Sequence, residues 1–456
     1  MHSFGEAVLV PRSVGSAYIC AVTTLNPPDE VVEIARRLES KGFETWCVGG
    51  AIRDALIGHA HLDWDFATAA RPEQVRELFG HRRTIPVGIE FGTVGVLDAN
   101  GVMHEVTTFR RDVKTDGRHA EVEFGVSLDD DLARRDFTIN AMAFSPTRDE
   151  LRDPFGGRRD LEQRVVRAVG DPHARMREDR LRALRGIRFA SRFGFALDAE
   201  TLKAIRESAP HLGRLSAERV KQEIEKTMDQ VARPAEAFRM WKSTGAFATL
   251  IPRLDAVPEE ALSVADHLAM PGLARRPQRR TLRIAGLLAG IDAPAVTRIL
   301  TDLRFSKQDS AWIAAVVGKW RSLGDEIGGA IVRGDSISDA TVRAWVASIG
   351  RLHVGAVMRL AIAVWAVRRA SGKPYPDERS AARIYRRMLG IAFRDPIELK
   401  DLAVDGDDLK RAGIAGGREL GTILQALLKR VLEDPALNRT DWLLQEGLRL
   451  YQEQRN

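Results

Sequence analysis

The sequence predicts an α+β fold, in which an N-terminal head with a small mixed β-sheet and helices precedes a long all-α part. Between residues 43 and 169, short runs of alternating apolar and polar residues interleave with a few helical patterns. From Asp171 the pattern is helical almost to the C-terminus and is interrupted mainly at prolines. The length of 456 residues is enough for several domains, each with its own core.

Composition and charge indicate a globular protein with a surface for polyanions. Hydrophobic residues make up 44% of the chain and charged residues 29%. The net charge is only +6, but the basic residues occur in clusters, which favours binding of a polyanion. No segment approaches the roughly 20 apolar residues of a membrane span, so we expect no membrane partner. Cys20 and Cys47 provide neither a disulfide framework nor metal-ligand spacing, which favours the reducing cytoplasm.

The first elements of the head can be placed in order. Residues 1–27 lack the charged start and apolar run of a secretory signal, and we interpret them as a loose leader. The apolar spacing of Asp29–Lys41 predicts an amphipathic helix that stops at Gly42. Phe43–Val48 is typical of a short strand, and Ala51–Ile57 of a helix that begins directly after two glycines.

The two glycines predict a phosphate site. Gly49 and Gly50 allow the backbone to pass close to a bulky anion, and the start of a helix presents unpaired N–H groups. Arg53 lies in the first turn of that helix, where its guanidinium could bind the same phosphate through two hydrogen bonds.

Acidic residues on two predicted strands indicate a metal site. Leu62–Ala67 is typical of a strand, and residues two apart on a strand point to the same face, so Asp63 and Asp65 project together. Two adjacent carboxylates repel each other unless a divalent cation lies between them, and oxygen ligands suit Mg²⁺. Glu105, on the strand predicted at Met103–Phe109, is our candidate for a third carboxylate in a two-metal site. A phosphate site beside a Mg²⁺ site indicates nucleotidyl transfer.

A polar segment further along predicts more nucleotide contacts. Arg134 and Arg135 are adjacent, so we expect them to point to different sides, one toward a triphosphate and the other outward. Asp136 and Asn140 are four apart and share a face if the segment is helical, where they could bind a ribose hydroxyl. Upstream, residues 110–117 (RRDVKTDG) are polar and end in glycine, which predicts a mobile loop near the site.

A helix predicted at Glu178–Phe189 carries an arginine stripe with one aspartate. In a continuous helix, Asp179 lies one turn before Arg182. An aspartate acceptor beside an arginine donor matches the amino group and ring nitrogen of cytosine and of adenine. The same pair rejects uracil and guanine, at about 1–3 kcal/mol per mismatched pair of contacts.

Taken in order, these motifs carry a family resemblance. The segments GGAIRD, DWD, HEVTTF, RRDFTIN, DPFGG and EDRLRALRGIRF, which span about residues 43–193, resemble the bacterial class II tRNA nucleotidyltransferases, close relatives of the bacterial poly(A) polymerases. Leu399–Gly417 is similar to the tail segment of the tRNA-specific members, which favours addition of CCA. The stretch Leu282–Asp292 lacks the paired His-Asp of those relatives that carry a phosphohydrolase domain, so we expect no such activity.

The resemblance implies one site for the incoming nucleotide. Its residues are Gly50 and Arg53 at the triphosphate, Asp63 and Asp65 at Mg²⁺, Arg135 and Asp136 at the nucleotide, Asp179 and Arg182 as a protein template for CTP and ATP, and Arg185 and Arg188 beside them. After the leader (1–27), it also implies a catalytic head (28–169), a helical neck (170–250), a body (251–350) and an RNA-binding tail (351–456).

The implied reaction is a two-metal transfer of CMP and AMP units to the 3′ end of tRNA, with release of pyrophosphate and no evident protein partner. Basic residues predicted to bind the RNA backbone are Arg275, Arg276, Arg279, Arg280, Arg383, Arg386 and Arg387. Alternatives within the class are a poly(A) polymerase and a partial enzyme that adds only CC or only A. An RNA-binding protein without activity is disfavoured by the intact Asp63 and Asp65, and a small-molecule nucleotidyltransferase would not need the helical body.

Overall fold

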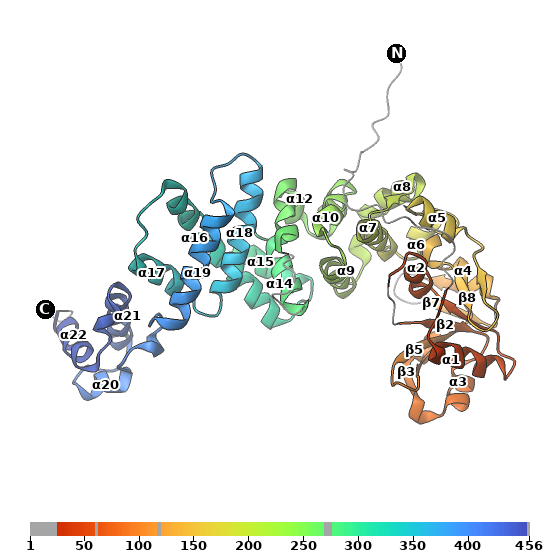
Figure 1. Ribbon diagram of the computed structural model, residues 1–456, viewed down its shortest axis with the longest axis horizontal. Helices are drawn as coiled ribbons and strands as arrows, with labels where there is room; N and C mark the ends of the chain where they lie inside the picture. The colour runs from red at the N-terminus through yellow and green to blue at the C-terminus, as the bar shows by residue number, and fades with distance from the viewer. Residues whose placement is uncertain (1–24, 60–62, 116–119, 269–275, 454–456) are drawn as a thin grey trace, which may run out of the picture. The chain divides into compact units, whose positions relative to one another are not determined.

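The computed structural model describes residues 25–59, 63–115, 120–268 and 276–453. It divides into two compact units. The head unit comprises the chain up to Arg182 together with Phe195–Ala204, and the helical unit comprises Ala183–Gly194 and the chain from Ile205 onward (Figure 1). The fold is α+β, as predicted, with the strands in the head. The finer division into neck, body and tail stays a prediction, and most of the leader lies outside the described residues.

Eleven strands are present in the described chain, all in the head unit. They are β1 (Thr45–Val48), β2 (Asp65–Thr68), β3 (Thr84–Gly88), β4 (Thr93–Leu97), β5 (Met103–Thr108), β6 (Arg110–Thr115), β7 (Ala120–Phe124), β8 (Ala143–Ser145), β9 (Glu150–Arg152), β10 (Val165–Val166) and β11 (Ala196–Leu197). Seven of them form a mixed sheet in the order β3-β4-β5-β2-β1-β8-β9, in which only β2 and β5 pair in parallel. The pairs β6–β7 and β10–β11 stand apart from this sheet.

The head unit also contains helices. They are α1 (Asp29–Glu39), α2 (Gly50–Leu56), α3 (Pro72–Phe79), α4 (Leu128–Ala133), α5 (Gly157–Gln163) and α6 (Pro172–Glu178), while α7 (Leu181–Phe193) and α8 (Ala199–Ser208) cross the boundary between the units. Leu128 and Leu132 of α4 share a core cluster with Trp46, Val48 and Ala67, so α4 covers one face of the sheet at β1 and β2. The part of that face on β3, β4 and β5 carries exposed side chains instead.

The rest of the described chain is helical. Its helices are α9 (Ala217–Gln230), α10 (Pro234–Ser243), α11 (Ala246–Leu250), α12 (Pro252–Asp255), α13 (Glu259–Leu262), α14 (Arg276–Leu287), α15 (Ala293–Asp302), α16 (Lys307–Arg333), α17 (Asp339–Ile349), α18 (Val354–Ala370), α19 (Glu378–Arg394), α20 (Gly406–Arg411), α21 (Arg418–Glu433) and α22 (Thr440–Glu453). Among the described helices, none alone has the length and apolar composition of a membrane span; α17 and α18 reach them only together, with a bend of 103° between them.

Two of the expected elements were wrong. The predicted loop 110–117 begins with a strand, β6, and Arg111 of that strand pairs with Glu123 of β7 at 2.7 Å. An exposed hairpin tolerates the polar composition that suggested a loop, and residues 116–119 lie outside the described residues. The predicted helix Glu178–Phe189 is two helices, because α6 ends at Glu178 and α7 begins at Leu181. Asp179 is extended (φ −144°, ψ 106°) and lies in the break.

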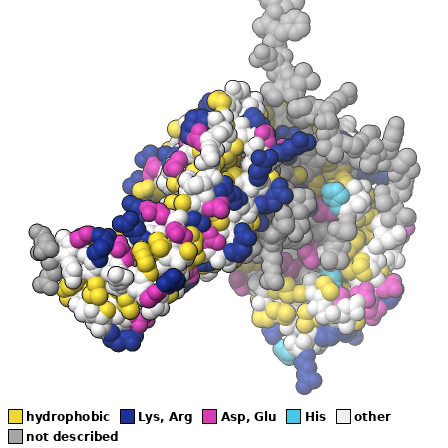
Figure 2. All heavy atoms as spheres, turned by 60° about the vertical axis from the view of Figure 1, so that its left-hand side comes forward, with side chains coloured by type: hydrophobic (Ala, Val, Ile, Leu, Met, Phe, Trp, Pro, Cys, Tyr) yellow, Lys and Arg dark blue, Asp and Glu magenta, His cyan; other side chains and the backbone are white. Residues whose placement is uncertain are grey.

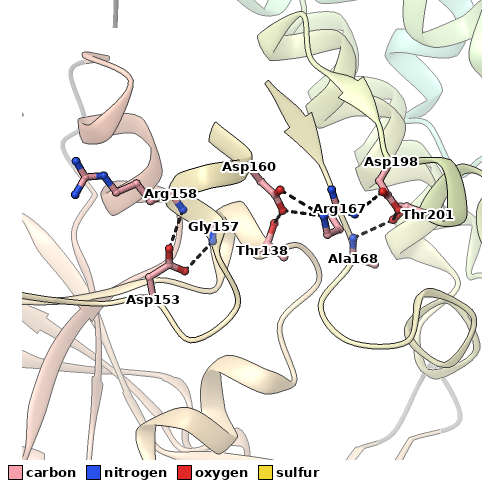
Figure 3. A network of polar contacts seen from close by, with 9 residues as sticks. All are labelled: Thr138, Asp153, Gly157, Arg158, Asp160, Arg167, Ala168, Asp198 and Thr201. Carbon is pink, nitrogen blue, oxygen red and sulfur yellow. Dashed lines mark hydrogen bonds and ion pairs between the residues drawn. The ribbon is translucent and has the colours of Figure 1, made fainter. Parts of the chain in front are cut away.

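A buried polar network links the turn at Thr138 to α5 and to the start of α8 (Figure 3). The fully buried Asp160 accepts a hydrogen bond from Thr138 Oγ1 at 2.7 Å and one from Arg167 Nε at 3.1 Å. Arg167 also pairs with Asp198, just before α8. Gly157, at the start of α5, has no room for a side chain, since a Cβ there would lie 2.2 Å from the carbonyl oxygen of Thr138. The network therefore fixes the short 3₁₀ turn Thr138–Asn140 against α5.

Candidate active site

The glycine turn between β1 and α2 is lined by two guanidinium groups. Gly49 has φ +78°, a conformation that favours glycine. A Cβ on Gly49 would lie 3.0 Å from Nη1 of Arg135, and one on Gly50 would lie 3.4 Å from Nη2 of Arg53. The absence of both side chains therefore lets two cationic groups approach the backbone at this turn, as an anion site requires.

Arg53 connects the turn to residues almost ninety positions away. Its side chain is buried, with Nε 2.7 Å from Asp54 Oδ1 and Nη1 bonded to Asn140 Oδ1. Asn140 in turn donates to Asp136 Oδ1 at 2.9 Å. The structure thus brings Arg53, Asp136 and Asn140 together, although the segment is a 3₁₀ turn and not the α-helix that we considered.

Asp131 holds both arginines of the RRD triplet. Arg134 Nη2 lies 2.6 Å from Asp131 Oδ1, and Arg135 Nη2 lies 3.1 Å from Oδ2. The expectation that one arginine faces outward was wrong, because α4 ends at Ala133 and the following turn directs both side chains back onto the same carboxylate. Burial raises the pKa of Asp131, but the two guanidinium groups outweigh burial and hold its pKa below the usual value. The cluster stays charged at neutral pH.

Arg135 retains unused hydrogen-bonding capacity. Within the described part of the chain, its buried Nε has no hydrogen-bond partner, and its Nη1 reaches the carbonyl oxygen of Asn140 only at 3.5 Å. Buried guanidinium nitrogens are ordinarily paired, so an unsatisfied one beside a glycine turn fits a site for an anionic group.

The two carboxylates lie at the end of β2. Asp65 is its first residue and is half-buried, Asp63 is exposed, and the intervening Trp64 is buried. Asp63 and Trp64 precede the strand, so the shared face of Asp63 and Asp65 stays a prediction. Val48 pairs with Asp65, so the carboxylates adjoin the glycine turn.

Burial, and then the charge of Asp65, raise the pKa of the Cys47 thiol, which keeps that thiol neutral.

The donor set fits a hard divalent cation. Carboxylate oxygens are the ligands that such a cation prefers, and a pair of them leaves positions for phosphate oxygens and water. In the chain as described, no group of three or more His, Cys, Asp and Glu side chains is placed to bind one metal. Glu105 is exposed, and its strand β5 pairs with β2 in the register that puts Glu105 beside Asp65. Its part as a third carboxylate stays a prediction.

Arg182 lies within the head unit and contacts the same segment. Nη1 donates to Glu178 Oε2 at 2.7 Å and to the carbonyl oxygen of Arg175 at 3.2 Å, and Nη2 donates to the carbonyl oxygen of Arg134 at 2.8 Å. Asp179 Oδ1 accepts from the backbone N–H of Leu181 at 3.0 Å. The pair is therefore not one turn apart on a single helix. Asp179 caps the helix on which Arg182 occupies the first turn.

The remaining arginines of α7 belong to the helical unit. Arg188 is buried and binds Glu223 of α9 through Nε at 2.7 Å and Gln230 through Nη1 at 3.0 Å. Arg185 lies over the ring of Phe189, 5.4 Å from its centroid. Their assignment to the nucleotide stays a prediction, and for Arg188 the observed contacts are those of a structural ion pair.

The predicted RNA-binding arginines differ in their surroundings. Arg280 pairs with Asp229 at 2.9 Å and Arg387 pairs with Asp339, whereas Arg383 and Arg386 are exposed. Arg275 and the side chains of Arg276 and Arg279 lie outside the described residues. Figure 2 shows basic side chains interspersed with acidic and hydrophobic ones on the visible face of the helical unit.

Two residues of the site were missed from the sequence. Asp131 precedes Arg134 and Arg135 by three and four positions, the spacing of helical ion pairs, and this signal could have identified it. Glu178 binds both Arg175, at 2.6 Å, and Arg182. It could have been identified from the same spacing to Arg182.

Comparison with known families agrees with this geometry. Residues 45–167 match the "Poly A polymerase head domain", and residues 194–257 match the "Probable RNA and SrmB- binding site of polymerase A". The chain is a nucleotidyltransferase.

Relatives over almost the full length define the family more narrowly. The chain is 36% identical to the CCA-adding enzyme of Geobacillus kaustophilus over 434 residues, 93% of this chain and 98% of the relative. It is 31% identical to the CCA-adding enzyme of Limosilactobacillus reuteri, over 91% and 94% of the two chains. The solved structure of the Bacillus stearothermophilus CCA-adding enzyme in complex with CTP superposes with a TM-score of 0.72 at 30% identity, over 94% of this chain and 99% of that one. The chain belongs to the CCA-adding enzymes.

Proposed function

We propose that this chain adds CCA to the 3′ end of tRNA, with CTP and ATP as donors and pyrophosphate as the leaving group. The observation that carries the proposal is the pairing of Val48 with Asp65, which sets the carboxylate pair beside the glycine turn. Family membership supports it, as do solved structures of CCA-adding enzymes with CTP, with ATP and with tRNA_CCA.

Cationic groups at the turn bind the triphosphate in this proposal. Arg135 supplies the unsatisfied Nε, and Asp131 keeps its side chain oriented. Arg53 is held by Asp54 and Asn140, so its guanidinium is fixed in position before the nucleotide arrives. Asn140 donates a hydrogen bond that orients Asp136, and Asp136 contacts the nucleotide in this proposal. Preorganised charges of this kind stabilise the negative charge that moves onto the leaving pyrophosphate.

Asp63 and Asp65 hold the metal in this proposal, and Mg²⁺ is the ion that their oxygen donors suit. When bound, the metal lowers the pKa of the RNA 3′-hydroxyl and stabilises charge on the α-phosphate. No separate side-chain base is assigned. Glu105, beside Asp65 on the adjacent strand, assists at the same face.

Asp179 and Arg182 select the base. Arg182 has five N–H donors. Three of them bond to Glu178 and to two backbone carbonyl oxygens. The remaining donors suit a ring nitrogen, and the carboxylate of Asp179 suits an exocyclic amino group. Cytosine and adenine present both of these groups on one edge, whereas uracil and guanine present a carbonyl beside a ring N–H.

The helical unit binds the RNA through shape and backbone contacts, to which the exposed Arg383 and Arg386 contribute. A tRNA acceptor and two cysteines without a disulfide framework favour the cytoplasm as the location.

Product length tests the proposal. Purified protein receives tRNA that ends at the discriminator base, at C or at CC, with CTP and ATP supplied separately and together. The expected products are completed CCA ends from all three acceptors when both nucleotides are present. Unlimited A tails would identify a poly(A) polymerase, and arrest after CC, or extension of CC-ended tRNA alone, would identify a partial enzyme.

The metal role has a separate test. Asp63→Ala should abolish incorporation while tRNA binding, measured by fluorescence anisotropy, stays within about twofold. Loss of tRNA binding together with activity would contradict it.

A further inference from the structure

Exposed hydrophobic side chains concentrate on one part of the head unit. Among the described residues, nine large hydrophobic side chains are exposed, and five of them lie between residues 85 and 103. Four of these, at 40–45% exposure, form what we call the apolar shelf: Ile85, Val87, Phe91 and Met103. A local concentration of exposed apolar side chains is typical of an interaction site.

The shelf lies on the same face of the sheet as the carboxylates. Ile85 of β3 pairs with Gly95 of β4, and Gly95 pairs with Glu105 of β5. The parallel register of β5 with β2 places Glu105 level with Asp65. Residues directly opposite on paired strands point to one face, so a single row runs from the shelf to the predicted metal site.

Gly95 makes the shelf continuous. A Cβ at this position would lie 2.8 Å from Met103 Sδ and 3.1 Å from Val87 Cγ2, so these two side chains meet above the glycine backbone. Phe91 lies against the end of β3, 3.7 Å from the position of a Cβ on Gly88. Apolar side chains of β3 and β5 therefore meet over β4, with Phe91 beside the end of β3.

We propose that the apolar shelf stacks the unpaired nucleotides at the 3′ end of the acceptor RNA. This inference rests on the proposed function, in which the 3′-hydroxyl must reach Asp63 and Asp65. Strands are spaced about 4.8 Å apart, so β3 lies about 14 Å from β2, within the reach of the last few nucleotides. Apolar and aromatic side chains stack on any base, which suits an acceptor whose last base changes with each addition.

A second copy of the chain is the competing occupant, since β3 is an edge strand. Two features oppose strand pairing there. Pro86 has no N–H to donate, and the register between Pro86 and Gly88 is irregular. Another strand is therefore disfavoured from pairing with the edge of β3, whereas the exposed side chains of the apolar shelf remain available to bind RNA.

Steady-state kinetics of a double variant test the shelf. In Phe91→Ala/Met103→Ala, the KM for CC-ended tRNA should rise about tenfold, while the KM for ATP stays within about twofold. Val102→Ala is the matched control, an equally exposed apolar side chain (40%) that precedes β5 and does not belong to the shelf. The conservative single variant Phe91→Leu keeps an apolar side chain at this position, so it should retain most of the wild-type affinity for CC-ended tRNA. On tRNA with abasic 3′-terminal residues, wild type and double variant should have the same KM.

The outcomes separate the two proposals. Wild-type protein that adds no nucleotide to tRNA would refute the proposed function. In that case anisotropy with a CC-ended minihelix still measures the shelf without turnover. Unchanged RNA affinity in the double variant would refute the stacking role of the apolar shelf and would leave the proposed function intact. A change of assembly on gel filtration without a change in RNA affinity would assign the surface to a second copy and would also overturn the inference.

Discussion

Buried carboxylates hold arginines in both units of the molecule, but the arginines differ in what they have left to offer. In the head unit, Asp131 binds Arg134 and Arg135, and the Nε of Arg135 has no hydrogen-bond partner in the described chain. In the helical unit, Arg188 places all three nitrogens on Glu223 and Gln230. A guanidinium whose three nitrogens all bond within the protein contributes to stability, whereas one with a buried nitrogen that has no partner is suited to a ligand. On this contrast we propose that Arg135 binds a ligand, whereas Arg188 is structural.

The largest expected effect tests the structural side of this contrast. Glu223→Ala leaves Arg188 buried without its counter-ion and should lower the free energy of unfolding by about 3–5 kcal/mol. Denaturant unfolding measures it. The conservative Glu223→Gln retains hydrogen-bond acceptance and should cost less. Full activity per folded molecule is expected in both variants, and a selective loss of nucleotide binding in them would contradict the distinction.

The binding side should respond in the opposite manner. Arg135→Ala removes the guanidinium beside Gly49 and should lower kcat/KM for CTP and ATP by about a hundredfold, with little change in the melting temperature. Arg135→Lys keeps the charge but not the planar group and should recover only part of the activity. If Arg135→Ala lowers the melting temperature but retains the affinity for nucleotide, Arg135 has a structural role like that of Arg188.

Arg182 tests the contrast at the base. Arg182→Ala should reduce the discrimination against UTP and GTP by about 1–3 kcal/mol, or roughly fivefold to more than a hundredfold. Misincorporation ratios with single nucleotides measure this effect. Arg188→Ala serves as the comparison, since it should destabilise the protein without altering the ratios. Equal selectivity in wild type and Arg182→Ala would refute the template.

The smallest effect concerns the pH dependence of stability. Because the folded pKa of Asp131 is lowered, its contribution is fully present above the unfolded value of about 3.9 and is lost as the pH falls through the folded pKa. Asp131→Asn should therefore destabilise the protein at pH 7, and this difference should shrink below about pH 4. Unfolding free energies between pH 3 and 7 measure it; a constant difference would contradict it.

Local patterns in the sequence predicted most of the head. The spacing of apolar residues placed the first helix, which ends at Glu39 shortly before Gly42 (φ +80°), and the strand–glycine–helix succession around Gly49 and Gly50. These features depend on backbone geometry within a few residues, and such geometry can be inferred from sequence.

Other features depend on contacts that are remote in sequence. The break at Asp179 contains neither glycine nor proline, so helical periodicity runs through it without a signal. The stripe of arginines on α7 does not reveal that Arg188 meets Glu223, 35 residues away. Similarly, the link between Arg53 and Asn140 requires the folded sheet to bring the two segments together.

Gly157 has a consequence for genetics. Every possible replacement adds at least one carbon to a position where the carbonyl oxygen of Thr138 lies 2.2 Å away. An unbiased screen for loss of function should therefore recover Gly157 alongside Asp63 and Asp65, although this glycine contacts no substrate in the proposed mechanism. Such alleles would be distinguished by low protein abundance, and a compensating mutation elsewhere could not easily restore them, because the obstacle is the main chain itself.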